Sequence, residues 1–476
     1  MWYNINERAV LILELTEIFK ELGYDIDWTK DFARYFELWG SWYKGKVKSF
    51  HEYKVYNGVR KVNVKRKSLQ MAKKVCEDWA DLEFNERVSI TTDNEETNKK
   101  LQKILDDNDF WILCNQGIEK TFALGTGAFV CSVDNLTIDE DGNAIYDGEA
   151  RTTIQFLTAD KIIPLTWDNK GITECAFVDT KTEKGNKITK VSIHKRDENG
   201  QYVIINKFYS NDRNNLKPLP ELDYTFNTLG DIPWFEINKP NVCNNIDLDS
   251  PYGISIFANS IDILEGLDIA YDGIPNEYLL GKKRIFIDKE LTKINSIDGS
   301  ESLTFDVNDI AFYALPSDFN SSNSIGLQDN TQQLRIAEHT EGIQFMLNLL
   351  STKTGFGQTY YKFDNGTVAT ATEVVSQNSQ LFRTLKKHEI ILESNLHDIV
   401  KIIAHIETTF CNNPMPFENV IINFDDSIIE DKQKQWEIDK ADMSIGIMKR
   451  EEYRAKYYGE TEEEALKKLP EVESIV

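Results

Sequence analysis

The pattern of apolar and polar positions predicts helices through the first quarter of the chain. Residues 5–22, 67–84 and 95–123 each place apolar side chains at steps of three and four, the spacing of an amphipathic helix. In the second segment these positions are Leu69, Ala72, Val75, Cys76, Trp79 and Leu82. Gly125 and Gly127 are expected to end the third helix, because glycine readily adopts the conformations that follow a helix.

Between about residues 128 and 210 the apolar period changes to two, which predicts strands. Five strands are expected, at residues 128–133, 152–157, 172–179, 188–194 and 202–209. Turn pairs such as Asp141-Gly142 and Asn199-Gly200 separate them. This part of the chain is therefore expected to form an antiparallel meander.

From residue 252 onward, helical patterns return and enclose short strands. Helices are predicted at residues 252–281, 329–351 and 370–410, with a broken helical pair in the tail, and strands at 284–287, 302–305, 310–314 and 420–424. Pro275 is expected to kink the first of these helices, because proline removes a backbone donor. The separate helical and antiparallel segments favour an α+β fold. The length of 476 residues predicts two to four domains.

Charge and cysteine content narrow the classes of function. The formal net charge is −24, so the surface as a whole repels DNA, which argues against a static DNA-binding protein but not against a conduit for DNA. None of the six cysteines forms a CxxC pair, which is typical of buried thiols in a reducing compartment. The first residues do not resemble a signal peptide, and no run reaches the roughly 18 apolar residues of a membrane span. No membrane partner is expected.

Catalytic and cofactor motifs are missing from the sequence. The phosphate-binding pattern GxxxxGK[ST] does not occur, and neither do GxSxG and HExxH. Residues 139–143 (DEDGN) resemble the start of a calcium loop, but Ala144 and Ala150 stand where that loop needs glycine and glutamate. Asp-Gly is a strong hairpin signal, so a hairpin turn is favoured there. We expect no enzyme activity, no cofactor and no metal.

Two charged segments are candidates for contacts. Residues 60–74 carry seven basic side chains and no acid, which fits a nucleic-acid patch, a solvated helix face or a complement to an acidic neighbour. The acidity of the whole chain favours the last two interpretations. The helix predicted at 252–281 carries acidic residues at helical spacing, and we expect four of them to face a channel or solvent: Asp262, Glu265, Asp268 and Asp272. Leu264, Leu267 and Tyr271 are expected to face protein.

The loop at residues 352–368 is a third candidate. Its glycines free the backbone, and its two lysines are its only basic side chains. The residues singled out here are Lys353, Gly355, Gly357, Tyr360, Tyr361 and Lys362. We expect the tyrosines to contact DNA or each other.

Several segments resemble portal proteins of tailed bacteriophages, in the branch that infects Gram-positive bacteria. The matching segments, in chain order, are residues 39–45 (WGSWYKG), 66–80 (RKSLQMAKKVCEDWA), 158–165 (TADKIIPL), 366–376 (GTVATATEVVS) with Asn378-Ser379, 421–429 (IINFDDSII) and 449–453 (KREEY). None is catalytic, so their order along the chain carries the resemblance.

The resemblance implies a ring of about twelve copies at one capsid vertex, through which double-stranded DNA passes without sequence specificity. It implies a wing at 1–250, a stem helix at 251–281, a clip at 282–328, a second stem helix at 329–351, a tunnel loop at 352–368, a long wing helix and strand at 369–425, and a crown at 426–476. The implied partners are terminase, major capsid and scaffold proteins, and head-completion or adaptor proteins. The implied location is the virion, after assembly in the host cytoplasm.

Two other classes remain open at this point. Another oligomeric virion connector or tail protein would share the context but not this order of segments. An enzyme, such as a nuclease or nucleotide hydrolase, would need the motifs that are missing. Ring shape in electron micrographs tests the first alternative, and a hydrolysis assay tests the second.

Overall fold

The structure of the chain, a computed structural model, divides into two compact units. One unit comprises Met1–Phe84 and Thr91–Ile422, and the other comprises Asn85–Ile90 and Asn423–Val476. The residues that the structure describes are 15–26, 29–56, 58–85, 88–138, 144–145, 150–183, 185–212, 215–288, 293–295, 301–303, 312–315, 327–330, 333–362, 371–417, 419–424, 432–458 and 466.

The larger unit begins with helices, most of them where the apolar period predicts helices. Residues 15–21 are helical, and the helices that follow are α2 (Thr29–Tyr43), α3 (Lys48–His51), α4 (Met71–Glu83), α5 (Glu95–Asp107) and α6 (Phe110–Leu124). The single helix expected at 95–123 is two helices, because Asp109 takes a left-handed conformation between α5 and α6. The aromatic side chains of α2 are largely buried, with Trp39 and Trp42 at 1% and 2% exposure.

The predicted strands form two sheets rather than one meander. The larger sheet runs in the order β12-β11-β10-β9-β8, with β13 beside β11, and all its pairs are antiparallel. Its strands are β8 (Ile162–Asp168), β9 (Gly171–Glu183), β10 (Asn186–Arg196), β11 (Tyr202–Asp212), β12 (Asn215–Pro218) and β13 (Tyr224–Asn227). Leu15 and Phe19 of the first helix pack against this sheet at Ile163 and Val191. The meander prediction is thus confirmed for the predicted strands at 172–179, 188–194 and 202–209, which are β9, β10 and β11.

The two earlier strands belong to a second, three-stranded sheet of order β14-β4-β7. Its strands are β4 (Gly127–Asp134), β7 (Arg151–Thr158) and β14 (Phe235–Asn238). Between β4 and β7, the short strands β5 (Thr137–Ile138) and β6 (Ala144–Ile145) pair with each other, as the predicted hairpin requires. A further pair, β1 (Glu52–Tyr56) with β2 (Lys61–Lys65), forms a ribbon that the sequence pattern did not indicate.

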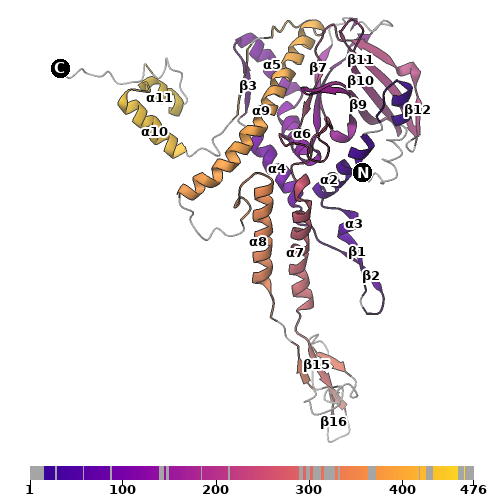
Figure 1. Cartoon of the computed structure of the whole chain (residues 1–476), viewed down its shortest axis with the longest axis vertical. Helices are drawn as coiled ribbons and strands as arrows, with labels where there is room; N and C mark the ends of the chain where they lie inside the picture. The colour runs from indigo at the N-terminus through magenta and orange to yellow at the C-terminus, as the bar shows by residue number, and fades with distance from the viewer. Residues whose placement is uncertain are drawn as a thin grey trace, which may run out of the picture. The chain divides into compact units, whose positions relative to one another are not determined.

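Two helices of the larger unit lie side by side and lead into short strands (Figure 1). They are α7 (Ile261–Leu280) and α8 (Ile336–Lys353). Strand β15 (Ile285–Asp288) follows α7, and β19 (Leu327–Asp329) precedes α8; they pair with each other, while β15 also pairs with β18 (Phe312–Leu315). Strands β16 (Lys293–Asn295) and β17 (Glu301–Leu303) form another pair. Most of the clip expected at 282–328 lies outside the described residues.

The predicted helix at 252–281 begins later than the sequence indicates. Residues before η3 (Ala258–Ser260) are irregular, because Gly253 lies against the backbone of Gly125, where neither position has room for a Cβ atom. The helix that follows is continuous through Pro275. Pro275 has no backbone N–H, so this helix has one hydrogen-bond donor fewer, and the kink expected there stays a prediction.

The longest predicted helix is confirmed as α9 (Ala371–Thr409), which at 39 residues is roughly 58 Å long. It packs against α4 and the strands β4, β7 and β14 with buried Leu385, Leu392 and Ile403. Strands β3 (Ser89–Thr92) and β20 (Val420–Asn423) are also formed. Among the described residues, no helix is long and apolar enough to cross a membrane.

The smaller unit contains the helical pair expected in the tail. Helices α10 (Lys432–Ile445) and α11 (Arg450–Tyr458) are joined at Asp439, which accepts hydrogen bonds from Lys456 Nζ at 2.6 Å and from the Tyr457 hydroxyl at 2.7 Å. The break between them falls near residues 446–449, as predicted. Mixed helices and sheets in both sequence and structure confirm the α+β class.

A buried carboxyl group lies where α4 meets α9. Glu83, the last residue of α4, is 4% exposed, and burial together with the nearby Glu389 carboxylate raises its pKa to about 8. The Lys386 Nζ lies 2.9 Å from Glu389, so the lysine charge stabilises Glu389 rather than Glu83. Glu83 is therefore protonated in the folded chain at neutral pH.

We predict that Glu83→Gln removes part of the pH dependence of stability. The folded chain retains a proton at Glu83 that the unfolded chain releases above a pKa of 4.5, so stability falls as pH rises from about 4.5 to about 8. The melting temperature of the parent should fall more steeply across this window than that of Glu83→Gln. The exposed Glu95→Gln on α5 is the matched control and should follow the parent. Parallel curves for all three chains would contradict the assignment.

Candidate functional site

The α7–α8 pair is held together by a close helix contact and a charged clamp. Leu264 and Leu267 of α7 are buried, as are Leu347 and Leu350 of α8. The pair can approach closely because α7 has glycines on this side. A Cβ atom at Gly266 would lie 3.1 Å from Met346 Cε, and one at Gly273 would lie 3.0 Å from His339 Cε1.

At the end of the pair nearest the short strands, Arg335 binds Glu277 through two side-chain hydrogen bonds. Both bonds, from Nε to Oε1 and from Nη2 to Oε2, are 3.1 Å long. These bonds and the guanidinium charge lower the pKa of Glu277 to about 2. The clamp fixes where the chain leaves α7 and where it returns to α8.

The acidic residues of α7 do not share one environment. Asp262 is exposed and Glu265 is half-buried, but Asp268 and Asp272 are only 3% and 8% exposed. The expectation that all four carboxylates face a channel or solvent is therefore wrong for Asp268 and Asp272. At 100° of rotation per residue, Asp268 and Asp272 lie beside the apolar stripe of α7. The spacing of the acidic residues among themselves did not reveal this position.

The buried carboxylates bind the segment that runs from α3 to α4. His51 Nε2 lies 2.9 Å from Asp268 Oδ2, and Val47 N–H donates to the other ring nitrogen at 2.9 Å. The backbone N–H of Leu69 donates to Asp268 Oδ1 at 2.7 Å. That of Lys67 donates to Asp272 Oδ1 at 3.1 Å. Sequence reasoning missed His51 and Leu69, since they are some 200 residues away in the chain.

The basic residues of 60–74 serve several separate contacts. The Arg66 guanidinium lies over the rings of Phe50 and Tyr53, at 4.1 and 4.7 Å from their centroids. Lys73 pairs with Glu119 at 2.7 Å. On the same helix, Lys74 pairs with Asp78 at 2.7 Å. The interpretation as a complement to acidic neighbours is confirmed for Lys73 and Lys74.

The first part of the loop after α8 is anchored on α4. Phe356 is buried and stacks between Trp79 and Tyr360, with ring centroids 4.5 and 4.3 Å away. The Tyr361 hydroxyl donates to Asp78 Oδ2 at 2.9 Å. The Trp79 indole N–H donates to the Thr354 carbonyl at 3.0 Å.

The glycines of this loop allow the backbone to turn, and its two tyrosine rings contact each other. Gly355 and Gly357 have φ angles of +92° and +96°, which other residues rarely adopt. Tyr360 and Tyr361 contact each other edge to face with centroids 5.0 Å apart, as expected. Lys353 and Lys362 are exposed, and residues 363–368 lie outside the described part of the chain. The described half of the loop is thus fixed rather than free.

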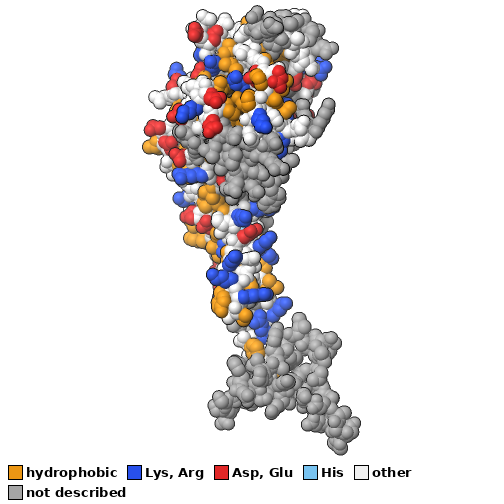
Figure 2. Space-filling view, turned by 90° about the vertical axis from the view of Figure 1, so that its right-hand side faces the viewer, with side chains coloured by type: hydrophobic (Ala, Val, Ile, Leu, Met, Phe, Trp, Pro, Cys, Tyr) orange, Lys and Arg blue, Asp and Glu red, His pale blue; other side chains and the backbone are white. Residues whose placement is uncertain are grey.

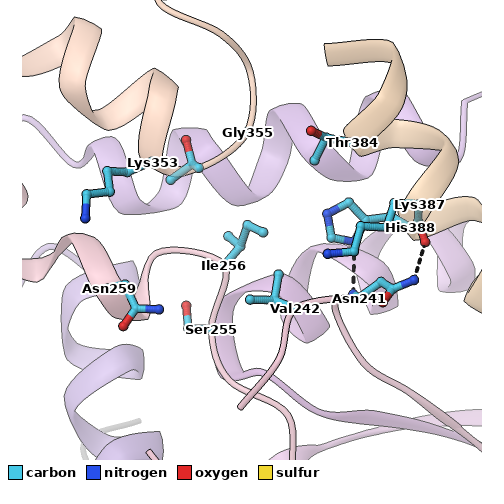
Figure 3. A pocket seen from close by; sticks show the side chains of 11 residues that line it. Asn241, Val242, Ser255, Ile256, Asn259, Lys353, Gly355, Thr384, Lys387 and His388 are labelled. Atoms are coloured by element: carbon cyan, nitrogen blue, oxygen red, sulfur yellow. Dashed lines mark hydrogen bonds between the residues drawn. The ribbon is translucent and has the colours of Figure 1, made fainter. Parts of the chain in front are cut away.

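A small cavity of about 110 Å³ lies between this loop and α9 (Figure 3). Lys353 and Gly355 line it from the α8 side, and Lys387 and His388 line it from α9. Burial lowers the pKa of His388 to about 3, so the ring is neutral, and its Nδ1 accepts a hydrogen bond from Asn241 N–H at 3.0 Å. Ser255 and Thr384 also line the cavity, but His388 Nε2 has no hydrogen-bond partner among the described residues, so neither hydroxyl is paired with this ring. The described residues contain no cluster suited to a metal ion.

We predict that Asp268→Ala lowers the free energy of unfolding by about 3 kcal/mol, because His51 and the Leu69 N–H lose their buried acceptor. Asp262→Ala on the same helix removes an exposed carboxylate and should change the free energy of unfolding by less than about 0.5 kcal/mol. Denaturant melts of the two variants and the parent measure both effects. Equal losses for the two variants would show that Asp268 is not the buried anchor.

Comparison with known proteins adds to this geometry. A family model described as "Phage portal protein, SPP1 Gp6-like" matches residues 24–474. No curated protein matches the chain. A solved structure titled "Neck of native GTA particle computed with C12 symmetry" matches with a TM-score of 0.39 and 11% identity over 84% of this chain and 90% of that chain, a likeness too weak to carry an argument. Because the family model covers nearly the whole chain, the protein belongs to the SPP1 Gp6-like family of phage portal proteins.

Proposed function

We propose that the chain forms a ring at one vertex of a phage head and that double-stranded DNA passes through this ring during packaging and ejection. The observation that carries the proposal is the family match from residue 24 to residue 474. Portal proteins are structural components of the virion, and no chemistry is needed from a subunit that serves as a conduit.

Exposed apolar side chains on the helix pair support assembly. On α8, Phe345 is 60% exposed and Leu349 is 38% exposed. On α7, Ile269 and Leu279 are 53% and 57% exposed. Exposed large apolar groups on two neighbouring helices favour a protein partner. A head-to-tail contact that closes on itself gives a ring, because each copy presents two different surfaces.

The family also suggests the copy number and the other proteins that the ring binds. We propose about twelve copies, docking to terminase during packaging, contact with major capsid and scaffold proteins, and later binding of head-completion or adaptor proteins. The division into wing, stem, clip, tunnel loop and crown stays part of this proposal, as does assembly in the host cytoplasm.

The negative net charge of the chain suits a channel that DNA moves through better than a surface that binds DNA tightly. With a net charge of −24, most of the surface repels phosphates, so DNA moves without many contacts that must be broken. Asp262 and Glu265 are the two carboxylates of the predicted channel face that remain accessible on α7. We propose that they contribute to a repelling wall.

We predict that the purified chain forms a very large ring-shaped species and hydrolyses no ATP. Native mass spectrometry gives the copy number, and electron microscopy gives the shape. A stable monomer at high concentration and physiological salt would contradict the ring. ATP turnover that co-purifies with the chain, and that a point substitution abolishes, would contradict the structural role.

The loop at 352–368 is proposed to line the narrowest part of the channel. Its anchored residues bring the exposed Lys353 and Lys362 to either end of a fixed segment. A cation near the DNA path supplies transient contact with phosphates. We propose that Lys353 and Lys362 make this contact.

We predict that the double variant Lys353→Ala, Lys362→Ala assembles normally but yields fewer DNA-filled heads, since transient phosphate contacts are lost. Packaging assays in infected cells count filled heads, and electron microscopy checks the rings. The control is Lys99→Ala with Lys103→Ala on α5, where both lysines are exposed. Normal packaging by the loop variant, or a loop on the outer rim, would overturn the assignment.

A further inference from the structure

The β1–β2 ribbon has two chemically different faces. Its strands pair antiparallel, with Tyr53 opposite Val64 and Val55 opposite Val62. Because side chains alternate along a strand, these four apolar residues share one face. The other face carries Glu52, Lys54, Tyr56, Lys61, Asn63 and Lys65, all exposed.

The apolar face of the ribbon lacks a core to pack on. Val55 is 40% exposed, and Tyr53, Val62 and Val64 are only partly buried. The tip carries Val59 at 85% exposure. A two-stranded ribbon alone is marginally stable in water, so such a ribbon with an uncovered apolar face favours a protein partner.

The polar face of the ribbon is basic on an acidic chain. It carries three lysines against Glu52, and in the described part of the chain Lys54, Lys61 and Lys65 have no ion-pair partner. Lys and Arg side chains gather on the side of the molecule where the ribbon lies (Figure 2). With a net charge of −24, another copy of the chain is an attractive partner for this ribbon.

The segment that follows the ribbon and helix α8 contact different sides of α7. The chain after the ribbon is fixed to α7 at Asp268 and Asp272, whereas α8 packs over Gly266 and Gly273. At 3.6 residues per turn these two sites lie roughly 130° apart around the helix. In the view of Figure 1, α7 lies between α8 and the ribbon.

The exposed stripe of α8 complements the ribbon. Glu338, Glu341, Phe345 and Leu349 follow at steps of three and four, so they line one side of α8, and all four are exposed. The acidic end of this stripe lies toward the short strands, as does the tip of the ribbon, whose turn carries the exposed Arg60 (Figure 1). Its apolar end is the end away from the short strands, and Tyr53 and Val64 pair near the end of the ribbon away from its tip.

We infer that the β1–β2 ribbon of one subunit packs against α8 of the next copy. Its apolar face covers Phe345 and Leu349, its lysine face turns away from α8, and the turn at its tip, which carries Arg60, lies near Glu338 and Glu341. This rests on the proposed ring, in which each copy must offer complementary surfaces on two different sides. The ribbon and the α8 stripe are two such surfaces, which explains why each stays uncovered in the single chain.

Site-specific crosslinking tests the contact. Two versions of the full chain, both with the exposed Cys243 replaced by serine, carry either Val64→Cys or Leu349→Cys and are co-assembled with different tags. A short bis-maleimide linker should join the two tagged chains in assembled rings. A chain with both substitutions should give a ladder of linked multimers. The matched control is Lys65→Cys, which faces the opposite side of the ribbon and should link several-fold less.

The outcomes separate this inference from the ring itself. Rings with strong Val64–Leu349 links and weak control links support the contact. Intact rings with no more linking than the control overturn it and leave the portal function standing. Links only within one chain would overturn the placement on opposite sides of α7. Unlinked rings that lose double-stranded DNA when Lys54, Lys61 and Lys65 become alanine would assign the ribbon to DNA instead. A chain that forms no ring overturns the proposed function and this contact together.

Discussion

Two carboxylates on one face of α7 are buried, and a buried carboxylate is costly unless hydrogen-bond donors surround it. Asp268 and Asp272 obtain these donors from His51 and from the backbone N–H groups of Lys67 and Leu69. The requirement ties the segment from α3 to α4 onto α7. The position of the ribbon, the direction of α4 and the side of α7 left for α8 all depend on this attachment.

The same attachment explains how an acidic chain uses its basic residues. Once the backbone of Lys67 and Leu69 is bound to α7, Lys73 and Lys74 lie on α4 within reach of Glu119 and Asp78. Asp78 in turn holds the Tyr361 hydroxyl. The neighbouring Trp79 stacks on Phe356. Helix α4 therefore connects the buried carboxylates of α7 to the loop that follows α8. The two sites are joined by a continuous series of contacts through α4.

A ring subunit of the portal family needs rigid attachments within each copy and unsatisfied surfaces between copies. Within the chain, the glycine contacts of α7, the Glu277–Arg335 clamp and the aromatic stack around Phe356 are all satisfied. The uncovered groups are of another kind: the apolar side of the ribbon, and Phe345 and Leu349 on α8. In the proposed ring, assembly buries apolar surface that folding leaves exposed, so the single subunit is an incomplete unit.

The sequence by itself determined the helices, most of the strands, the α+β class and the resemblance to portal proteins, since these depend on local periodicity and on segments in chain order. It also indicated the turn glycines Gly355 and Gly357. It did not determine that Asp268 and Asp272 are buried, because their donors come from residues about 200 positions away. Nor did it separate the strands into two sheets or reveal the β1–β2 ribbon, since an alternating pattern does not specify which strands pair. Only the tertiary structure decided these points, because burial and hydrogen-bond partners are set by contacts between distant segments.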